Sequence, residues 1–218
     1  DGTFEDVSRQ RGVEDDGWSV SAAFVDYDLD GWLDLYVANY VEYSTDADRP
    51  CPSVTGGIGY CVPQVYRAQP DRLYRNQGDG HFVDVSATAL VGRTFGAALG
   101  VVTADFDGDG WLDIYVANDG EENQLWTNQQ DGTLVNTAVL SGAALNWDGE
   151  AEGSMGVDAG DFDNDGDEDL FMTHLAAETN TLYLNNGTGL FEDRSAASGL
   201  GSPSLALTGF GAAWIDFD

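Results

Sequence analysis

Carboxylates on alternate residues of a glycine-containing turn recur along this chain, and their spacing suits a hard metal ion. Residues 26–34 read DYDLDGWLD, and residues 105–113 and 161–169 read DFDGDGWLD and DFDNDGDED. Each copy has Asp at positions one, three, five and nine, Gly at position six and an aromatic residue at position two. The glycine permits a sharp bend, so the carboxylates can turn toward one centre.

The type of ligand favours Ca²⁺, which takes roughly 6–8 oxygens, over Mg²⁺, which prefers a smaller and more hydrated octahedron. The loops contain neither Cys nor His, which argues against zinc and copper. We therefore predict about three calcium ions, one per complete loop, held by the four Asp and the carbonyl of position seven. A fourth copy begins at residue 216. The predicted ligands are Asp26, Asp28, Asp30, Trp32, Asp34, Asp105, Asp107, Asp109, Trp111, Asp113, Asp161, Asp163, Asp165, Asp167, Asp169, Asp216 and Asp218.

A single Asp-rich turn could equally be a solvated loop held by Asx-type hydrogen bonds. Copies in register favour metal binding, because four carboxylates in one small loop repel one another when no cation is present. The loops differ from EF-hands, which need a Glu at position twelve; here that position is Val37, Val116 or Met172. The residues after each loop are typical of strands, so each loop is predicted to join two strands.

Composition sets bounds on the function. The 218 residues include 8 basic and 39 acidic side chains, for a net charge of −31, which disfavours nucleic acid and anionic membranes as partners. A hydrophobic content of 42% with 11% aromatic residues argues against disorder, and 28 Gly fit a turn-rich β protein. We recognise neither a membrane span nor a signal peptide, and we expect any targeting segment to lie upstream or to have been removed.

The repeat extends beyond the loops. A strand with small residues precedes each loop, and Ser21, Gly100, Gly156 and Gly211 occupy equivalent positions, which predicts strands that converge on a crowded axis. Two further strands, joined by glycine-containing turns, follow. One unit is therefore four antiparallel strands with the loop between the first and second. Units of this kind at a spacing of about 55 residues predict an all-β fold, a β-propeller built from such blades.

The pattern also predicts the boundaries of the units. Residues 1–13 are the last strand of a preceding blade, and residues 208–218 start a further one. The complete blades span residues 18–92, 96–142 and 153–200. Because three blades cannot close a ring, we expect the end strands to be completed by more of the same chain or by a neighbouring subunit. Leu134 and Asn136 replace the usual Phe and Asp, which weakens the prediction of the second outer hairpin.

The first unit carries an insertion at about residues 41–70, which contains both cysteines, Cys51 and Cys61. In an acidic protein with calcium loops, a disulfide is the natural interpretation, and two free thiols are the alternative. The spacing matches no zinc or redox motif.

The loops, together with turns of the form Asn-x-x-x-Gly-x-Phe, resemble FG-GAP/VCBS repeats, which are shared with integrin α-chain propellers. The segments Tyr60–Pro63, Val116–Asp119 and Met155–Asp158 are similar to the cartilage-acidic-protein-like (ASPIC/UnbV-associated) family. The resemblance covers essentially the whole chain. It implies an extracellular, calcium-bound propeller of seven blades, with roles in adhesion, matrix contact or scaffolding.

Other candidate chemistry is sparse. His81 lies in a turn, and His174 is expected to make local hydrogen bonds. The acidic pairs Glu121/Glu122 and Glu150/Glu152 could suggest glycoside hydrolysis, but such pairs arise by chance in so acidic a chain. Trp32 and Trp111 could stack on sugars, although packing between blades is the simpler use. The sequon at Asn186 could carry a glycan.

Two classes of function follow. The first is a non-catalytic, secreted calcium-binding module for adhesion, matrix contact or structural assembly, with no active site in these residues. Its partner is an extracellular protein, a polysaccharide or further copies of the chain. The second is the scaffold or substrate-binding part of a larger secreted, polysaccharide-acting enzyme, whose active site lies elsewhere. A catalytic domain beside the repeats would support the second class.

Overall fold

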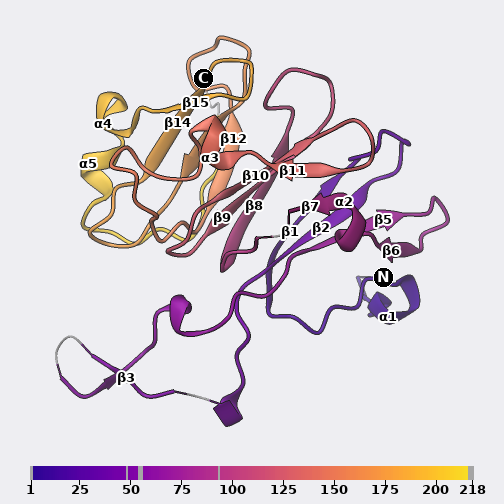
Figure 1. Ribbon diagram of the computed structural model, residues 1–218, viewed down its shortest axis with the longest axis horizontal. Helices are drawn as coiled ribbons and strands as arrows, with labels where there is room; N and C mark the ends of the chain where they lie inside the picture. Colours follow the sequence, from indigo (N-terminus) through magenta and orange to yellow (C-terminus); the bar gives the residue numbers. More distant parts are fainter. Residues whose placement is uncertain (1, 48, 54–55, 93, 216–218) are drawn as a thin grey trace.

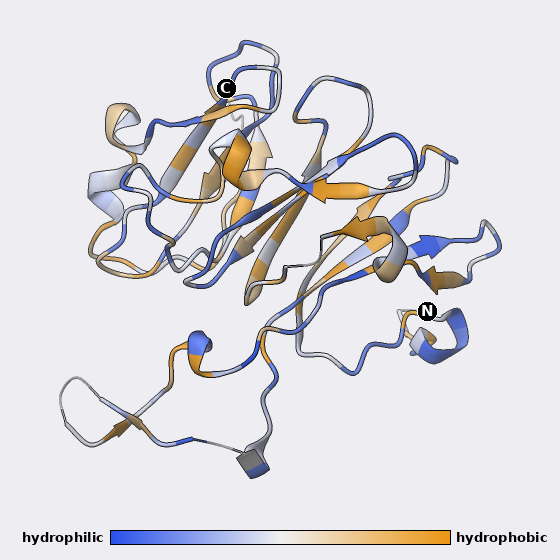
Figure 2. Cartoon of the chain, in the orientation of Figure 1, coloured by the Kyte–Doolittle hydropathy of each residue, from blue (hydrophilic) through white to orange (hydrophobic). Residues whose placement is uncertain are grey.

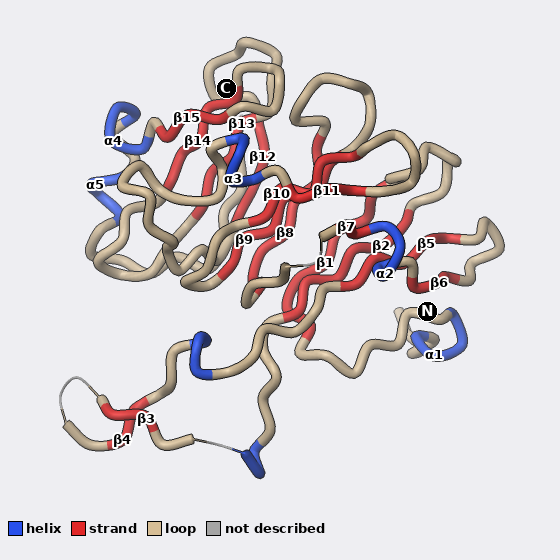
Figure 3. The backbone as a smooth tube through the Cα atoms, in the orientation of Figure 1, coloured by secondary structure: helices blue, strands red, loops and turns tan. Residues whose placement is uncertain are grey.

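A computed structural model describes residues 2–47, 49–53, 56–92 and 94–215. Within these ranges the protein is all-β, as predicted, and its helices are single turns (Figure 3). The strands form three large sheets that lie side by side, from which one long excursion of the chain projects (Figure 1). No helix in the described ranges is long and apolar enough to cross a membrane.

Each large sheet is a sequential antiparallel meander. In the first sheet the strands are β1 (Ser19–Val25), β2 (Asp34–Asn39), β5 (Arg72–Asn76) and β6 (Phe82–Asp84). In the second they are β8 (Ala98–Ala104), β9 (Asp113–Asn118), β10 (Gln124–Asn128) and β11 (Leu134–Asn136). In the third they are β12 (Val157–Gly160), β13 (Asp169–Met172), β14 (Thr181–Asn185) and β15 (Phe191–Asp193). The predicted four-strand unit is therefore present in each.

The second sheet has an additional strand. The short strand β7 (Leu90–Val91) pairs in parallel with β11 at the outer edge. The sequence analysis places residues 90 and 91 at the end of the first unit, and in the structure they pair with a strand of the second sheet. The pairing covers backbone groups that the edge strand β11 would otherwise expose, and it ties the end of the first unit to the second. The β10–β11 hairpin itself forms despite the substitutions at Leu134 and Asn136.

The glycines before the second and third loops lie where the innermost strands of neighbouring sheets approach closely. Strand β8 lies beside both β1 and β12. A Cβ on Gly100 would come within 2.5 Å of the Met155 carbonyl oxygen, and one on Gly156 within 2.7 Å of the Cα of Gly211. Both distances are shorter than packed atoms allow, so glycine permits the innermost strands of neighbouring sheets to approach.

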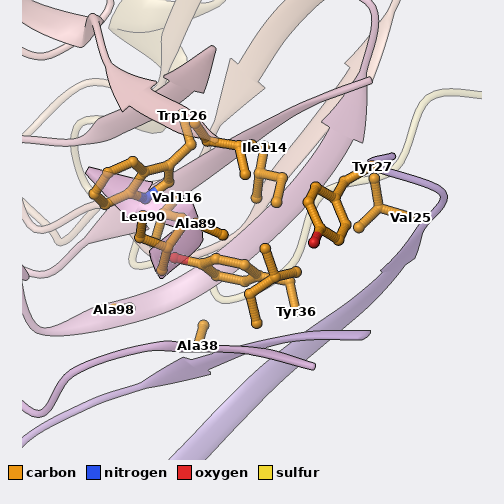
Figure 4. Packing of buried hydrophobic residues seen from close by; sticks show 12 residues of the cluster. Val25, Tyr27, Tyr36, Ala38, Ala89, Leu90, Ala98, Ile114, Val116 and Trp126 are labelled. Atoms are coloured by element: carbon orange, nitrogen blue, oxygen red, sulfur yellow. The ribbon is translucent and has the colours of Figure 1, made fainter. Parts of the chain in front are cut away.

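Two apolar clusters fill the spaces between neighbouring sheets, and the hydrophobic residues concentrate along the strands (Figure 2). In the first cluster, Tyr36 of β2 faces Val116 of β9 and Leu90, and all are buried (Figure 4). The second cluster joins the second sheet to the third through residues such as Tyr115 and Leu170. Burial of each large apolar side chain stabilises the stack by about 1.5–3 kcal/mol.

A one-turn helix follows the fourth strand of each meander, which the sequence analysis did not predict. These helices are α2 (Ser86–Ala89), α3 (Ala138–Ser141) and α4 (Ser195–Ser198). An Asp or Asn two residues earlier starts each one, since Asp84, Asn136 and Asp193 accept hydrogen bonds from the amides of Ser86, Ala138 and Ser195. Asn136 thus performs the role of the aspartate that it replaces.

The predicted strands at the two ends differ from the structure. Residues 2–7 form no strand, Phe4 is fully exposed, and the helical turn α1 (Ser8–Arg11) follows. Residues 208–215 also form no strand, although they run beside β12, where the Trp214 amide donates to Asp158 Oδ2 at 2.8 Å. In both segments, no neighbouring strand among the described residues supplies a hydrogen-bonded ladder, so the backbone lacks the pairing that defines a strand.

The insertion projects as an arm away from the sheets (Figure 1). Its tip is the two-stranded hairpin β3 (Cys51–Pro52) and β4 (Ile58–Gly59), closed by the disulfide Cys51–Cys61, which confirms the predicted pairing. The base of the arm is attached to the second sheet, because Gln64 Nε2 donates to the Asp119 carbonyl at 2.9 Å and the Tyr40 hydroxyl donates to Asp119 Oδ2 at 2.6 Å.

We expect reduction of the disulfide to loosen the arm and leave the sheets intact. Neither apolar cluster includes a residue of the arm, so the main melting temperature should change by less than about 2 °C, corresponding to under about 1 kcal/mol. Limited chymotrypsin digestion at the exposed Tyr60, next to Cys61, should become at least several times faster. The variant Cys51→Ser/Cys61→Ser should reproduce both results, and a large fall in its melting temperature would contradict this assignment.

Candidate metal centres

The three Asp-rich loops lie at equivalent places in the three sheets. Each joins the innermost strand to the second strand, after β1, β8 and β12. Position six adopts a left-handed conformation, with φ of 89° at Gly31, 88° at Gly110 and 97° at Gly166. Since residues with a Cβ rarely adopt this conformation, glycine is required there for the loop to turn back on itself.

Each loop brings the carboxylates of positions one, three and nine together. Among the described residues, the acidic groups that could hold a metal ion are these sets, each with one oxygen per residue within 4.8 Å of the others. They are Asp26, Asp28 and Asp34; Asp105, Asp107 and Asp113; and Asp161, Asp163 and Asp169. The predicted ligands Asp216 and Asp218 lie outside the described residues.

The carboxylates of position five point differently. One oxygen of each accepts the backbone N–H of position seven, at 2.9 Å for Asp30, 2.8 Å for Asp109 and 3.0 Å for Asp165. They therefore shape the loop and are not among the converging groups. That they are ligands, together with the carbonyls of Trp32, Trp111 and Asp167, stays a prediction.

The Asp at position nine is buried and anchors each loop to its sheet. Asp113 Oδ2 accepts the amide of Phe106 at 3.1 Å, and Oδ1 accepts the amide of Asn128 at 2.8 Å. Asp34 and Asp169 make the equivalent bonds. Burial raises the pKa of Asp34 to about 6 and that of Asp113 to about 7, and it also raises the pKa of Asp169. A bound cation would offset this cost of holding a buried negative charge.

The first loop contains a further sign of a missing partner. Asp26 Oδ2 accepts the amide of Gly31 at 3.0 Å. Its other oxygen, Oδ1, is buried and has no hydrogen-bond partner in the described part of the chain. Buried polar atoms are nearly always satisfied. The residues of the loop thus fit a hard cation placed among Asp26, Asp28 and Asp34.

Neighbouring loops are linked by a chain of hydrogen bonds between sheets. Asn128 Nδ2 in the second sheet donates to the carbonyl of Tyr27, at position two of the first loop, at 2.8 Å. Asn185 Nδ2 in the third sheet donates to the carbonyl of Phe106, at position two of the second loop, at 2.7 Å. The backbone amides of the same two asparagines donate to the buried Asp at position nine of their own loops. Each loop is therefore fastened to the next.

The sequence motif that contains these asparagines does not predict their role, because the carbonyl that each binds is 79 or more residues away. Asp71 is a further residue that was not predicted. This carboxylate is buried and accepts the Tyr36 hydroxyl at 2.8 Å and the Asn39 amide at 2.7 Å. The Pro that precedes Asp71 was the only local signal.

Asp71 makes stability depend on pH. Burial raises its pKa to about 7, above the value of about 3.9 in an unfolded chain. A carboxyl whose pKa is raised by folding stabilises the protein fully below the unfolded pKa and loses that contribution as pH rises through the folded pKa. The unchanged protein should lose this contribution between pH 5 and pH 8, whereas Asp71→Asn, which cannot titrate, should not. The unfolding free energy of Asp71→Asn minus that of the unchanged protein should therefore rise by about 1–2 kcal/mol over this range. Urea unfolding at both pH values measures this; a difference that does not vary with pH would contradict it.

The two histidines lie in different surroundings. His81 is exposed and lies 3.1 Å from Asp79. His174 is buried, its Nε2 lies 3.1 Å from Ser154 Oγ, and burial lowers its pKa to about 4, so it is neutral at pH 7. Its predicted local hydrogen bonding is confirmed.

The structure also shows where the two loop tryptophans and the glycosylation sequon lie. Trp32 is half-exposed and lies against Gly78, in the β5–β6 turn of its own sheet. Trp111 is partly buried. Asn186 is exposed in the β14–β15 turn, where its Oδ1 accepts from Thr188. Whether it carries a glycan stays a prediction.

Comparison with known proteins gives weak but consistent relatives. Cartilage acidic protein 1 of Homo sapiens is 24% identical over 257 aligned positions, which cover 98% of this chain and 38% of that protein. The Mus musculus protein is 25% identical with 98% and 39% coverage, and the Xenopus tropicalis protein is 24% identical over 208 positions with 79% and 32% coverage. The chain thus spans 32–39% of the length of these relatives.

Among solved structures, one similar chain is an Agrocybe aegerita lectin that specifically recognises non-reducing terminal N-acetylglucosamine. It covers 84% of this chain and 41% of its own, with 19% identity and a TM-score of 0.43. The family model of the FG-GAP-like repeat matches residues 64–116 and 105–172, which together make up half of the chain and include the second and third loops. This chain belongs to the family of FG-GAP-like repeat proteins.

Proposed function

We propose that this chain is a non-catalytic, calcium-binding part of a β-propeller that acts outside the cell as an interaction or structural module. The observation that carries the proposal is the repeated site: in each of the three sheets, an Asp at positions one, three and nine of the loop converges on one point. A solvated Asp-rich turn would not require a buried carboxylate, yet Asp34, Asp113 and Asp169 are all buried.

Calcium is the cation that these groups suit. The converging ligands are all carboxylate oxygens, which favours Ca²⁺, Mg²⁺ or Mn²⁺ over zinc and copper. The loops are rich in carboxylates, and Ca²⁺ tolerates the irregular, high coordination that such loops provide. Bound Ca²⁺ would neutralise charge at sites that otherwise hold three or more carboxylates together.

The propeller is the arrangement that we propose for the sheets. Its support is the stacking of sequential four-strand meanders with their innermost strands adjacent. In this proposal the units are the blades at residues 18–92, 96–142 and 153–200, and residues 1–13 and 208–218 belong to further blades. The disulfide and the similarity to cartilage acidic protein 1 support a secreted location.

The proposed role is binding, not catalysis. The two histidines are 93 residues apart in sequence; one is exposed in a turn and the other is buried and neutral. In the described residues, neither completes a set of nucleophile, base and orienting group. The partner that we propose is an extracellular protein or polysaccharide, or a further copy of the chain.

Calorimetric titration of the metal-free protein tests the proposal directly. We expect about three Ca²⁺ per chain, and a much weaker response to Mg²⁺, whose octahedral site needs retained waters. Asp105→Asn should remove one binding event. The matched control is Asp131→Asn, because Asp131 lies in the β10–β11 turn, outside the loops, and accepts from Thr133. Titration heats no larger than those of dilution, or equal affinities for Ca²⁺ and Mg²⁺, would overturn the proposal.

A further inference from the structure

The first loop differs from the others because a positively charged side chain already lies on it. Arg75 of β5 places its Nε 2.7 Å from Asp28 Oδ2 and its Nη2 3.5 Å from Asp30 Oδ2. Its guanidinium therefore neutralises part of the charge at positions three and five. It comes from the third strand of the same sheet, at the ladder position opposite Val83.

The equivalent positions in the other sheets are uncharged. They are Thr127, opposite Val135 in β11, and Leu184, opposite Glu192 in β15. Among the ion pairs of the described residues, none involves a carboxylate of the second or third loop. The contrast is specific because the whole chain has only 8 basic residues, against 39 acidic ones.

The guanidinium engages two carboxylates of the loop and does not contact Asp26 or Asp34. It contacts Asp28 and Asp30, whereas the buried Asp26 Oδ1 remains without a hydrogen-bond partner in the described part of the chain. Asp34 is engaged with backbone amides. A cation can therefore still enter among Asp26, Asp28 and Asp34, but it meets a site whose negative charge is already partly neutralised.

We infer that Arg75 makes the first loop the weakest of the three calcium sites, filled after the second and third, and that it holds this loop in shape when no metal is bound. The inference rests on the proposed function, because it concerns the same loops. A fixed positive charge lowers the affinity for a divalent cation by Coulombic repulsion and by engaging ligand oxygens. Because Arg75 is half-exposed, solvent screens the effect to about tenfold.

The test is the variant Arg75→Thr, which gives the first loop the residue of the second. The matched control is Arg72→Thr, since Arg72 lies on the same strand but pairs with Asp84 and Asp15, away from the loop. Calcium titration should resolve two tight sites and one about tenfold weaker site in the unchanged protein and in Arg72→Thr. In Arg75→Thr the three sites should have similar affinities.

Thermal melting supplies a second readout. With chelator, Arg75→Thr should melt at a lower temperature than Arg72→Thr, because its first loop has lost its tethered cation. Saturating calcium should remove or reverse this difference. Three equal sites in the unchanged protein, or an Arg75→Thr titration that matches Arg72→Thr, would overturn the inference while the proposed function stood. No calcium binding by any variant would overturn both.

Discussion

Removal of calcium should lower the melting temperature of this protein by about 20 °C. Binding to the folded state alone stabilises it by about 2.7 kcal/mol per site when free ligand is 100 times the Kd. Three such sites amount to about 8 kcal/mol, and each kcal/mol corresponds to about 2–4 °C in a domain of this size. The effect is large because the buried carboxylates Asp34, Asp113 and Asp169 lose the cation that offsets their charge.

Differential scanning calorimetry with calcium, with a calcium-selective chelator, and with chelator plus Mg²⁺ measures this effect. We expect Mg²⁺ to restore little of the lost stability. Asp113→Asn should melt at a lower temperature in calcium and should lose less stability on chelation, whereas Asp131→Asn should behave as the unchanged protein. Superimposable melting curves with and without chelator would remove the basis for calcium in these loops.

Replacement of Asn185 by Ala should cost about 2–4 kcal/mol of unfolding free energy. Its Nδ2 donates to the carbonyls of Phe106, in the second loop, and Glu168, at 2.7 and 3.1 Å, and the side chain is buried. Alanine leaves both carbonyls without this donor, and a buried unsatisfied acceptor costs more than the net value of a hydrogen bond. Because the Phe106 carbonyl belongs to the neighbouring loop, the variant should also weaken calcium binding there.

Asn76 supplies the matched control, because it occupies the same position in the first sheet. Its Nδ2 donates to the carbonyl of Leu33, in the loop of its own sheet, and it is less buried than Asn185. Asn76→Ala should cost about 1 kcal/mol, the net value of a typical hydrogen bond. Urea unfolding of both variants in saturating calcium gives the comparison. Equal losses would show that the link between sheets contributes nothing beyond the local bond.

Local patterns predicted the strands and the loops well, because their causes are local. A left-handed glycine at position six and apolar strands on either side specify a turn between strands whatever lies nearby. The same reasoning predicted strands at residues 2–7 and 208–215, where the sequence is strand-like but no strand forms among the described residues. A strand is defined by its hydrogen-bonded neighbour, and sequence pattern alone does not supply one. The pairing of Leu90 and Val91 with β11 was missed for the same reason.

The spacing of the aspartates alone predicted a loop that binds a hard cation, and it predicted the carboxylates that could bind the ion. Only the tertiary structure decided that positions one, three and nine converge while position five turns to the backbone, and that position nine is buried. Only the tertiary structure showed that Arg75 contacts Asp28 and that Tyr36 donates to the buried Asp71. It alone showed that Asn128 and Asn185 donate to loops in other sheets. These contacts join residues 35 to 101 positions apart along the chain. Such partners are brought together by the pairing of strands within a sheet and by the packing of one sheet on the next, which no short stretch of sequence records.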